Sequence, residues 1–423
     1  MATRVFVTGM GIITAIGDNV EENLQSLKTG RSGIAEIRLL ETIHRGVLPA
    51  GEIRHSDAEL AAMAGVEPVD GLTRTALLGM VAAREAVRSS QFAVRSSQKS
   101  AVSGQQSSVD GNDILPTADC QLPTGLLSGC TVGGMSATEK YYLDYLSNDS
   151  RNAWISSNPC SESTERIAGF LGIRDYLSTI NTACSSSANA IMAAVRLIQA
   201  GRLDRALAGG TDALSMFTIN GFNTLMIYDK EPCKPFDDRR FGMNLGEGAA
   251  YLLLESEEVL GDKTPLCEIT GYGNSTDAFH QTALSPEGTG AYMSMKEALD
   301  RSGLRPEDIG YINAHGTATI NNDLSEGMAI QKLFGSHIPP VSSTKANTGH
   351  LLGASGAAEA VFSILSLQHN VAWPNLNFEV KMKELSFSPC SLVPLSANHR
   401  HVLSNSFGFG GNNTSLIFSK TEK

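Results

Sequence analysis

The sequence predicts an α/β protein in which helices cover β-sheets, and three observations indicate this class. Short runs of valine, isoleucine and leucine alternate with alanine-rich stretches of helical character, and many of the 41 glycines directly follow an apolar run. The chain has 423 residues, of which 42% are hydrophobic and 18% charged, an ordinary globular composition. This length is sufficient for a large core and exceeds that of a usual single domain, so we expect two packed units.

The two halves of the sequence show similar elements in a similar order. Residues 5–11 and 268–273 each combine a short apolar strand with a G-x-G turn, and in each half an alanine-rich helix precedes a strand that ends in glycines. Short glycine-rich matches also arise by chance, but the shared order of elements favours a twofold repeat. We therefore expect one unit over residues 1–260 and a second over residues 261–423.

One stretch of the first half does not fit a core. Residues 89–113 are crowded with serine, glutamine and glycine, and they overlap a near-tandem repeat of AVRSSQ at residues 86–91 and 93–98. Such a polar stretch cannot bury enough apolar surface to fold with the rest, so it predicts an exposed insertion. A role in docking a partner is the alternative interpretation.

Charge and hydropathy exclude two kinds of partner. Lys and Arg number 33 against 44 Asp and Glu, which gives a formal net charge of -11. Nucleic acid is not expected as a partner, because binding it requires a basic face that displaces counterions. No apolar run reaches the roughly 18 to 20 residues that span a bilayer, and the first apolar stretch is broken by Gly9 and Gly11. We expect a cytoplasmic protein with no membrane contact.

Cys184 is the cysteine whose surroundings indicate chemistry. The seven cysteines are widely spaced and form no CxxC pair, so neither a disulfide framework nor a metal site is predicted. Cys184 lies between a short strand and an apolar helix that ends at Gly201. A thiol at the start of a buried helix meets the positive end of the helix dipole, which predicts a lowered pKa and a reactive thiolate. The alternative is a small buried core cysteine.

Two histidines and a lysine occupy comparable junctions. His315 stands at the end of a predicted strand before a Gly/Thr loop, and His350 opens an alanine-rich helix five residues after Lys345. Each histidine alone is compatible with a structural role. In a layered α/β fold, however, strand-to-helix junctions gather on one edge of the sheet, so we expect these groups and Cys184 to meet.

Four segments resemble the β-ketoacyl-acyl carrier protein synthases, the decarboxylating ketosynthases with a Cys-His-His site. They occur in the family's order along nearly the whole chain and read TACSS at 182–186, NAHGTAT at 313–319, STKANTGH at 343–350 and NSFGFGG at 405–411. The resemblance implies the thiolase-like fold, with duplicated βαβαβ halves in a five-layer αβαβα arrangement. The first half would then carry the nucleophile and the second the two histidines.

The resemblance also implies a reaction. Cys184 would hold the acyl chain as a thioester, with its own N–H and that of Phe409 as the oxyanion hole. His315 and His350 would bind the thioester carbonyl of malonyl-acyl carrier protein, and loss of CO₂ would leave an enolate there. That enolate would attack the acyl-enzyme and extend a fatty acyl or polyketide/polyene chain by two carbons. Phe409 would also act as a gate, with Phe407 beside it.

Four further residues have supporting roles in this scheme. Lys345 would balance charge near His315, and Glu326 and Glu359 are its candidate partners, unless these glutamates are solvated helix charges. Thr317 and Thr319 would hydrogen-bond the pantetheine arm of the carrier protein. No metal and no cofactor is implied, because the phosphopantetheine of the carrier protein holds the reacting groups.

The resemblance leaves partners and pathway open. Acyl carrier protein is the implied substrate carrier, and the second subunit would be an identical chain or a cysteine-less paralogue. A non-catalytic chain-length or scaffolding subunit is the alternative function, although the presence of Cys184 disfavours it. Asn412 stands where the family usually has Thr, and residues 172–178 lack the usual Gly-Pro step. These departures suggest a divergent member that serves secondary metabolism.

Overall fold

The computed structural model describes residues 3–90, 122–148, 150–390, 395–396 and 398–421. Apart from Ser89 and Ser90, the expected insertion at residues 89–113 therefore lies outside the described residues. Within the described part of the chain, no helix is long and apolar enough to cross a membrane.

The main sheet of the described chain has the strand order β10-β9-β13-β14-β8-β1-β7-β6-β4-β5. Its first-half strands are β1 (Val5–Thr14), β4 (Thr124–Gly129), β5 (Tyr176–Ile180), β6 (Arg205–Asp212) and β7 (Gly248–Ser256). Its second-half strands are β8 (Cys267–Thr276), β9 (Tyr311–Asn313), β10 (Val341–Ser342), β13 (His401–Phe407) and β14 (Asn412–Ser419).

The strand order confirms the twofold repeat. Counted outward from the centre of the sheet, the order β1-β7-β6-β4-β5 matches the order β8-β14-β13-β9-β10. Corresponding pairs also share their direction. The pairs β1–β7 and β8–β14 are antiparallel, and the pairs β4–β5 and β9–β10 are parallel. The halves meet where Phe6 pairs with Glu268 and Val7 with Cys267. The chain passes from one set to the other after α10 (Glu257–Leu260).

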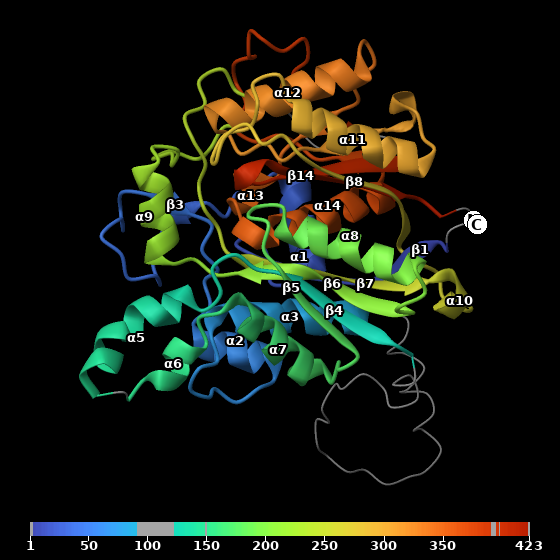
Figure 1. Cartoon of the computed structure of the whole chain (residues 1–423). Helices are drawn as coiled ribbons and strands as arrows, with labels where there is room; N and C mark the ends of the chain where they lie inside the picture. Colours follow the sequence, from blue (N-terminus) through green and yellow to red (C-terminus); the bar gives the residue numbers. More distant parts are fainter. Residues whose placement is uncertain (1–2, 91–121, 149, 391–394, 397, 422–423) are drawn as a thin grey trace.

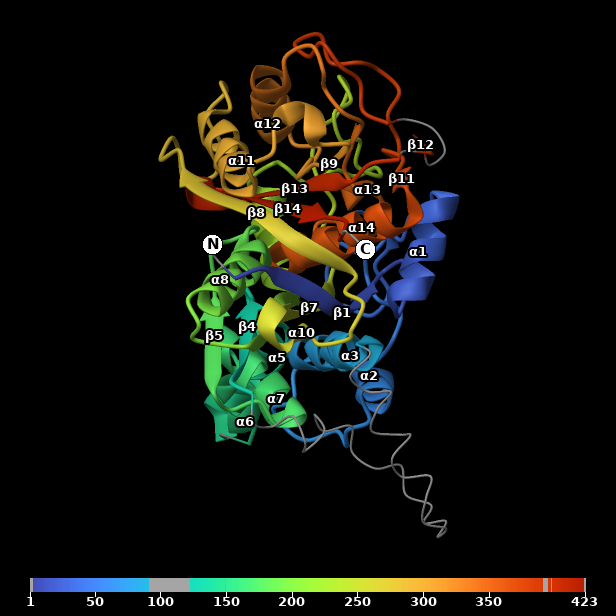
Figure 2. The same ribbon diagram turned by 90° about the vertical axis from the view of Figure 1, so that its right-hand side faces the viewer.

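Five layers are visible in Figure 1, and Figure 2 shows the same stack after a quarter turn. The outer helices are α3 (Arg74–Ser89) and α7 (Cys160–Leu171) on one side, and α11 (Thr289–Ser302) and α12 (Ile320–Phe334) on the other. Between the two halves of the sheet lie α8 (Ser186–Gln199) and α14 (Ser355–His369). This is the thiolase-like arrangement expected from the sequence.

The two central helices are buried on nearly every side, because sheet strands cover them from both directions. Of α14, residues 355–367 are all buried. A Cβ atom on Gly356 would lie 2.8 Å from the Cβ atom of Ala188 on α8, so small residues set the distance between the two helices. Apolarity around the whole helix, as in the sequence of α8, is typical of such a position.

The paired glycines of the repeat do not form turns as expected. Gly9 and Gly11 lie inside β1, and Gly271 and Gly273 lie inside β8. A Cβ atom on Gly11 would lie 2.1 Å from a carbonyl oxygen of α3, and one on Gly273 would lie 2.1 Å from a carbonyl oxygen of α11. The glycines therefore let an outer helix press directly on a strand, and the same device occurs in both halves.

The remaining elements are short or connect the layers. They are α1 (Val20–Thr29), β2 (Ala35–Glu36), β3 (Pro49–Ala50), α2 (Asp57–Ala64), α5 (Met135–Asn148), α6 (Asn152–Ser156), α9 (Met216–Thr224), η2 (Pro306–Asp308), α13 (Lys345–Thr348), η3 (Leu352–Ala354), β11 (Val371–Ala372), β12 (Leu395–Ser396) and η4 (Phe409–Gly411).

Candidate active site

Cys184 lies on residues 181–185, the turn from β5 to α8, which we call the thiol turn. Ala183 has a left-handed backbone with φ 54°, so the chain changes direction sharply before the cysteine. The Ser186 hydroxyl donates to the Ala183 carbonyl oxygen (2.5 Å) and accepts from the Thr182 N–H (2.9 Å). These bonds fix the conformation of the turn. The Cys184 side chain is 6% exposed and lines a cavity.

The backbone N–H groups of Cys184 itself and of Phe409 lie near the Cys184 sulfur and act to lower the pKa of its thiol. Phe409 belongs to residues 407–412, which we call the aromatic loop. A Cβ atom on Gly408 would lie 2.6 Å from a carbonyl oxygen of the thiol turn and 3.3 Å from the Cys184 nitrogen, so a glycine is required for this approach. The Phe409 ring stacks on Phe222 with 5.7 Å between centroids. Both donors therefore converge beside the thiol.

The pKa of Cys184 is raised, contrary to the expectation from its place before α8. Burial raises the pKa of this thiol to about 11, and the positive charge of Lys345 and the two N–H donors offset part of that effect. The sequence shows where a helix begins but not how completely the fold excludes water there. The resting side chain is therefore a neutral thiol at neutral pH.

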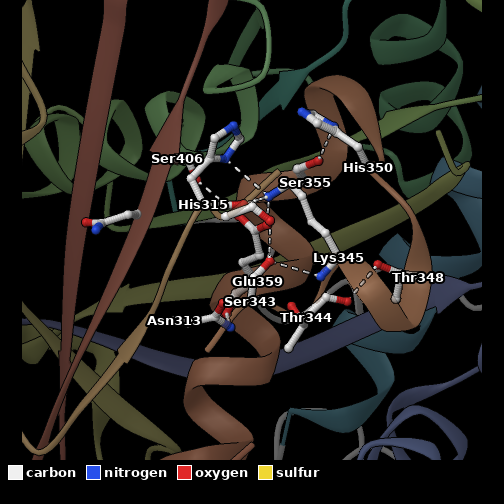
Figure 3. Close-up of polar contacts among 12 residues, drawn as sticks. Asn313, His315, Ser343, Thr344, Lys345, Thr348, His350, Ser355, Glu359 and Ser406 are labelled. Carbon is white, nitrogen blue, oxygen red and sulfur yellow. Dashed lines mark hydrogen bonds and ion pairs between the residues drawn. The ribbon is translucent and has the colours of Figure 1, made fainter. Parts of the chain in front are cut away.

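His350 lies on residues 343–354, called here the histidine segment, between β10 and α14. Its Nδ1 accepts from the Leu352 N–H (3.0 Å) and lies 3.0 Å from the Ser355 hydroxyl oxygen (Figure 3). Because the Leu352 N–H can only donate, the ring proton is on Nε2. Nε2 is buried and has no hydrogen-bond partner among the described residues. His350 therefore presents one unused N–H donor in a site that it lines.

Lys345 sets the protonation of His315. Its Nζ donates to the His315 carbonyl oxygen (2.6 Å), lies 3.1 Å from His315 Nδ1 and pairs with the Glu359 carboxylate (Figure 3). An ammonium group has no acceptor, so Nδ1 of His315 accepts and its proton is on Nε2. The rings of His315 and His350 are nearly perpendicular, at 88°, with 5.4 Å between centroids.

Both imidazoles are neutral in this environment. Burial and the positive charge of Lys345 hold the pKa of His315 and of His350 well below the usual value of a histidine. The two rings therefore act as N–H donors without carrying a full charge.

Of the two carboxylates expected beside Lys345, Glu359 forms the ion pair and Glu326 does not. Glu326 instead accepts from the N–H groups of His315 (2.9 Å) and of the following glycine (2.8 Å), and from the Asn405 side chain (3.0 Å). Burial raises the pKa of both glutamates to about 7, so neither is a solvated helix charge. Glu326 thus holds the backbone of His315, while Glu359 holds the ammonium group.

A cavity of about 230 Å³ brings the predicted side chains together. The Thr317 and Thr319 hydroxyl oxygens are 2.9 Å apart, and the Phe407 ring lies 5.8 Å from the His315 ring. The predicted residues that line the cavity are Cys184, His315, Thr317, Thr319, His350, Phe407 and Phe409. Lys345, Glu326 and Glu359 lie behind His315 and complete its surroundings.

The ligand atoms of Cys184, His315 and His350 lie within 4.8 Å of one another. One sulfur and two imidazole nitrogens at this spacing are also a donor set that zinc accepts. The Lys345 ammonium group, 3.1 Å from His315 Nδ1, opposes a second positive charge here. The site is therefore better suited to an anion that develops during a reaction.

Several supporting residues escaped the sequence interpretation. The Ser355 hydroxyl hydrogen-bonds Nδ1 of His350. The sequence offered one indication of this role, because Ser355 stands five residues after His350 at the start of a helix. Asn189, in the first turn of an apolar helix, and Asn274, in a central strand, hydrogen-bond Asn412 behind the thiol turn. A buried asparagine requires partners, so Asn189 was a signal in an otherwise apolar stretch.

The chain is similar to proteins of a known family. Residues 2–259 match the model of the beta-ketoacyl synthase N-terminal domain, and residues 266–379 match that of the C-terminal domain. The chain is 34% identical to the 3-oxoacyl-[acyl-carrier-protein] synthase 2 of Staphylococcus aureus (strain N315), over 99% of each chain. It is 31% identical to a putative mitochondrial 3-oxoacyl-[acyl-carrier-protein] synthase of Schizosaccharomyces pombe, again over 99% of each.

Solved structures show the same likeness. The ishigamide ketosynthase/chain length factor superposes with a TM-score of 0.88 at 28% identity, over 100% of both chains. The ketosynthase ApeO in complex with its chain length factor ApeC, from Xenorhabdus doucetiae, superposes with a TM-score of 0.79 at 28% identity, over 99% of this chain and 98% of the other.

Proposed function

The chain belongs to the beta-ketoacyl synthase family, and from this premise we propose that it catalyses a decarboxylative Claisen condensation on acyl carrier protein. The observation that carries the proposal is the convergence of one thiol and two neutral imidazoles on one cavity. The thiol accounts for holding an acyl chain, and the imidazoles account for stabilising an enolate. The chain is an acyltransferase of the 3-oxoacyl-acyl carrier protein synthase type.

The first step loads the acyl chain onto Cys184. Its sulfur attacks the thioester of an acyl carrier protein, and the N–H groups of Cys184 and Phe409 stabilise the charge on the tetrahedral oxygen. The pantetheine sulfur leaves with the electron pair of the broken C–S bond and takes up the proton that the Cys184 thiol gives up. The exchange consumes no net proton, which suits a thiol that is neutral at rest.

The second step forms the nucleophile for chain extension. The thioester oxygen of malonyl-acyl carrier protein accepts from the Nε2–H groups of His315 and His350, and loss of CO₂ leaves the enolate charge on that oxygen. Lys345 donates to Nδ1 of His315 and so keeps the donor proton on the other nitrogen. Fixed donors in a site that excludes water need no rearrangement when the charge forms.

The third step joins the two groups. The enolate carbon attacks the acyl carbon on Cys184, the tetrahedral oxygen again faces the backbone donors, and the C–S bond breaks. Because burial raises the pKa of Cys184, the released thiolate takes a proton from solvent and returns to the resting thiol. The product is a β-ketoacyl chain on the carrier protein, longer by two carbons.

The roles of the remaining residues are part of the proposal. Thr317 and Thr319 line the cavity with paired hydroxyls and would hydrogen-bond the pantetheine arm. Phe409, stacked on Phe222, would act as the gate. Phosphopantetheine on the carrier protein supplies the reactive thioesters, so the scheme requires no metal ion and no redox cofactor.

We further propose that the protein works with a second subunit. β5 is the last strand in the order of the sheet, and Tyr176 and Leu177 on it are 38% and 42% exposed. Leu143 and Leu146 on α5 are 77% and 62% exposed. A strand edge that carries exposed apolar side chains, and a helix that exposes others, favour pairing with another chain. The partner is an identical chain or a cysteine-less paralogue, as the ketosynthase/chain length factor neighbours suggest.

Two measurements on the purified protein test the function. Incubation with an acyl carrier protein charged with a fatty acyl chain should add one acyl mass to Cys184, as seen by intact mass and peptide mapping. Addition of malonyl-acyl carrier protein should then release CO₂ and the extended chain. A folded protein that takes up no acyl group from several acyl carrier proteins would instead be a non-catalytic chain-length or scaffolding subunit.

A further inference from the structure

Asn412, the first residue of β14, is the centre of a side-chain network behind the thiol turn. Its Oδ1 accepts from the Ser185 hydroxyl (2.8 Å), the Asn189 Nδ2 (2.8 Å) and the Asn274 Nδ2 (3.1 Å). These donors come from the thiol turn, from α8 and from β8. One amide oxygen therefore connects the start of β14 to three other segments.

The network closes on itself and on both sides of Cys184. Asn189 Oδ1 accepts from Asn274 Nδ2 (2.9 Å) and from the Thr414 hydroxyl (2.9 Å), and Asn189 Nδ2 also donates to the Thr182 hydroxyl (2.8 Å). Thr182 and Ser185 flank the cysteine on the thiol turn. Because Asn189 and Thr414 are buried, the bond between them is shielded from competing water, and the bonds of Asn189 to Asn274 and Thr182 are partly shielded.

Asn412 also ends the aromatic loop that carries the Phe409 N–H. Its carbonyl oxygen accepts from the Gly408 N–H (2.8 Å), so the segment from Gly408 to Asn412 is closed by its own backbone bond. The Asn412 side chain ties this closed segment to Ser185, the residue that follows Cys184. The position of the Phe409 N–H relative to the Cys184 sulfur thus depends on that amide.

The imidazole side of the site is held by other groups. His350 is fixed by Ser355 and Leu352, and His315 by Lys345 and Glu326. A disturbance of the asparagine network should therefore move the backbone donors and leave the imidazole donors in place. A purely structural residue would affect acylation and decarboxylation alike, whereas a residue that positions only the backbone donors would affect acylation alone.

We propose that Asn412 is the positioning residue of the oxyanion hole: its amide oxygen holds the Phe409 N–H in register with Cys184. The inference rests on the proposed condensing function. A misplaced backbone donor weakens stabilisation of the tetrahedral oxygen, so acyl transfer slows while decarboxylation does not. Substitution of Asn412 thus separates the two half-reactions.

The experiment compares Asn412→Leu, which keeps the size and removes the acceptor, with Asn412→Thr, which supplies a shorter acceptor. Asn412→Leu should lower the rate of Cys184 acylation by about 10- to 100-fold, up to the scale for loss of one oxyanion donor. Asn412→Thr should recover most of that loss. CO₂ release from malonyl-acyl carrier protein, measured on the Cys184→Ala background, should change less than about twofold with either substitution.

Each outcome has a defined meaning. Equal loss of acylation and CO₂ release would show a merely structural residue, and unchanged acylation in Asn412→Leu would also overturn the inference. Should Asn412→Leu fail to fold, Ser185→Ala removes one donor to the same oxygen and should slow acylation in the same direction by a smaller factor. Absence of acylation in the unsubstituted protein would instead contradict the proposed function.

Discussion

The thiol turn and the histidine segment occupy equivalent places in the two halves of the molecule. Each follows the outermost parallel strand of its half, β5 or β10, and each leads into a central helix, α8 or α14. The thiol turn crosses this gap with residues 181–185, whereas the histidine segment takes residues 343–354 and includes the helical turn α13. The same strand-to-helix connection is therefore a tight turn in the first half and a long segment with a helical turn in the second half.

In the proposed mechanism the two segments stabilise negative charge with different kinds of donor. The thiol turn and the aromatic loop bring the backbone N–H groups of Cys184 and Phe409 near the Cys184 sulfur. The histidine segment supplies the side-chain N–H of His350, and its Lys345, paired with Glu359, sets the protonation of His315 after β9. In the proposed mechanism the two segments thus form two separate oxyanion sites for two successive steps, and substitutions should affect them separately.

The largest effect should come from Cys184→Ala, which removes the one group that can hold the acyl chain. Acyl transfer and chain extension should be abolished, because no thioester can form. CO₂ release from malonyl-acyl carrier protein should continue, since it depends on His315 and His350. Mass spectrometry of the enzyme and trapping of labelled CO₂ measure both. If CO₂ release vanished with the thiol, the division between the two segments would be wrong.

The next largest effect should be on stability, through the ion pair that the histidine segment has and the thiol turn lacks. Lys345→Met leaves buried Glu359 without its partner, and because burial already raises the pKa of Glu359 to about 7, its carboxyl should take up a proton. The lost pairing should lower the free energy of unfolding at pH 7 by about 1–3 kcal/mol. The double variant Lys345→Met/Glu359→Gln should recover part of this loss, because glutamine is neutral without taking up a proton. Urea denaturation of the three proteins measures the difference. Equal stability of single variant and parent would rule out a buried pair.

His350→Ala should impair one half-reaction by a defined factor. Loss of one preorganised donor to an oxyanion typically costs about 10² to 10³ in rate, so CO₂ release should fall on that scale. Acylation of Cys184 should persist, because its donors are backbone groups. The rates of Cys184 acylation and of CO₂ release, measured on the same folded variant, test this prediction. A proportional loss of both would indicate that His350 only maintains the structure.

The smallest effect concerns which thiol reacts first with iodoacetamide. A hydrogen bond from Cys130 lowers the pKa of the half-buried Cys160 at the start of α7, whereas burial raises that of Cys184 to about 11. Among the described cysteines Cys160 should therefore be alkylated first near neutral pH, and Cys184 should accelerate as the pH rises toward 11. Peptide mapping at several pH values measures this order. Faster labelling of Cys184 at pH 7 would contradict the raised pKa.

The sequence predicted the fold class, the twofold repeat and the set of residues at the junctions, because each depends on local pattern. Strand ends followed by Cys184, His315 and His350 are visible without a structure. Other properties depend on packing between distant segments. Whether Glu326 or Glu359 reaches Lys345, and whether the thiol of Cys184 is shielded from water, is decided by helices that meet only in the folded state.

The role of the paired glycines could not be predicted from the local sequence either. A G-x-G pattern after an apolar run is compatible with a turn or with a strand against which a helix packs. In β1 and β8 it is the strand, because α3 and α11 lie directly on these residues. The choice between the two depends on a helix about 70 residues away in β1 and about 25 away in β8, so no local rule could make it.

The central layer has a consequence for how the chain folds. α14 contacts β6 and β7 of the first half and β13 and β14 of its own, and α8 likewise contacts β4 and β6 on one side and β8 and β14 on the other. Neither half can cover its own central helix, so a half expressed alone would expose an apolar face and aggregate. We therefore expect the two halves to fold as one cooperative unit rather than independently.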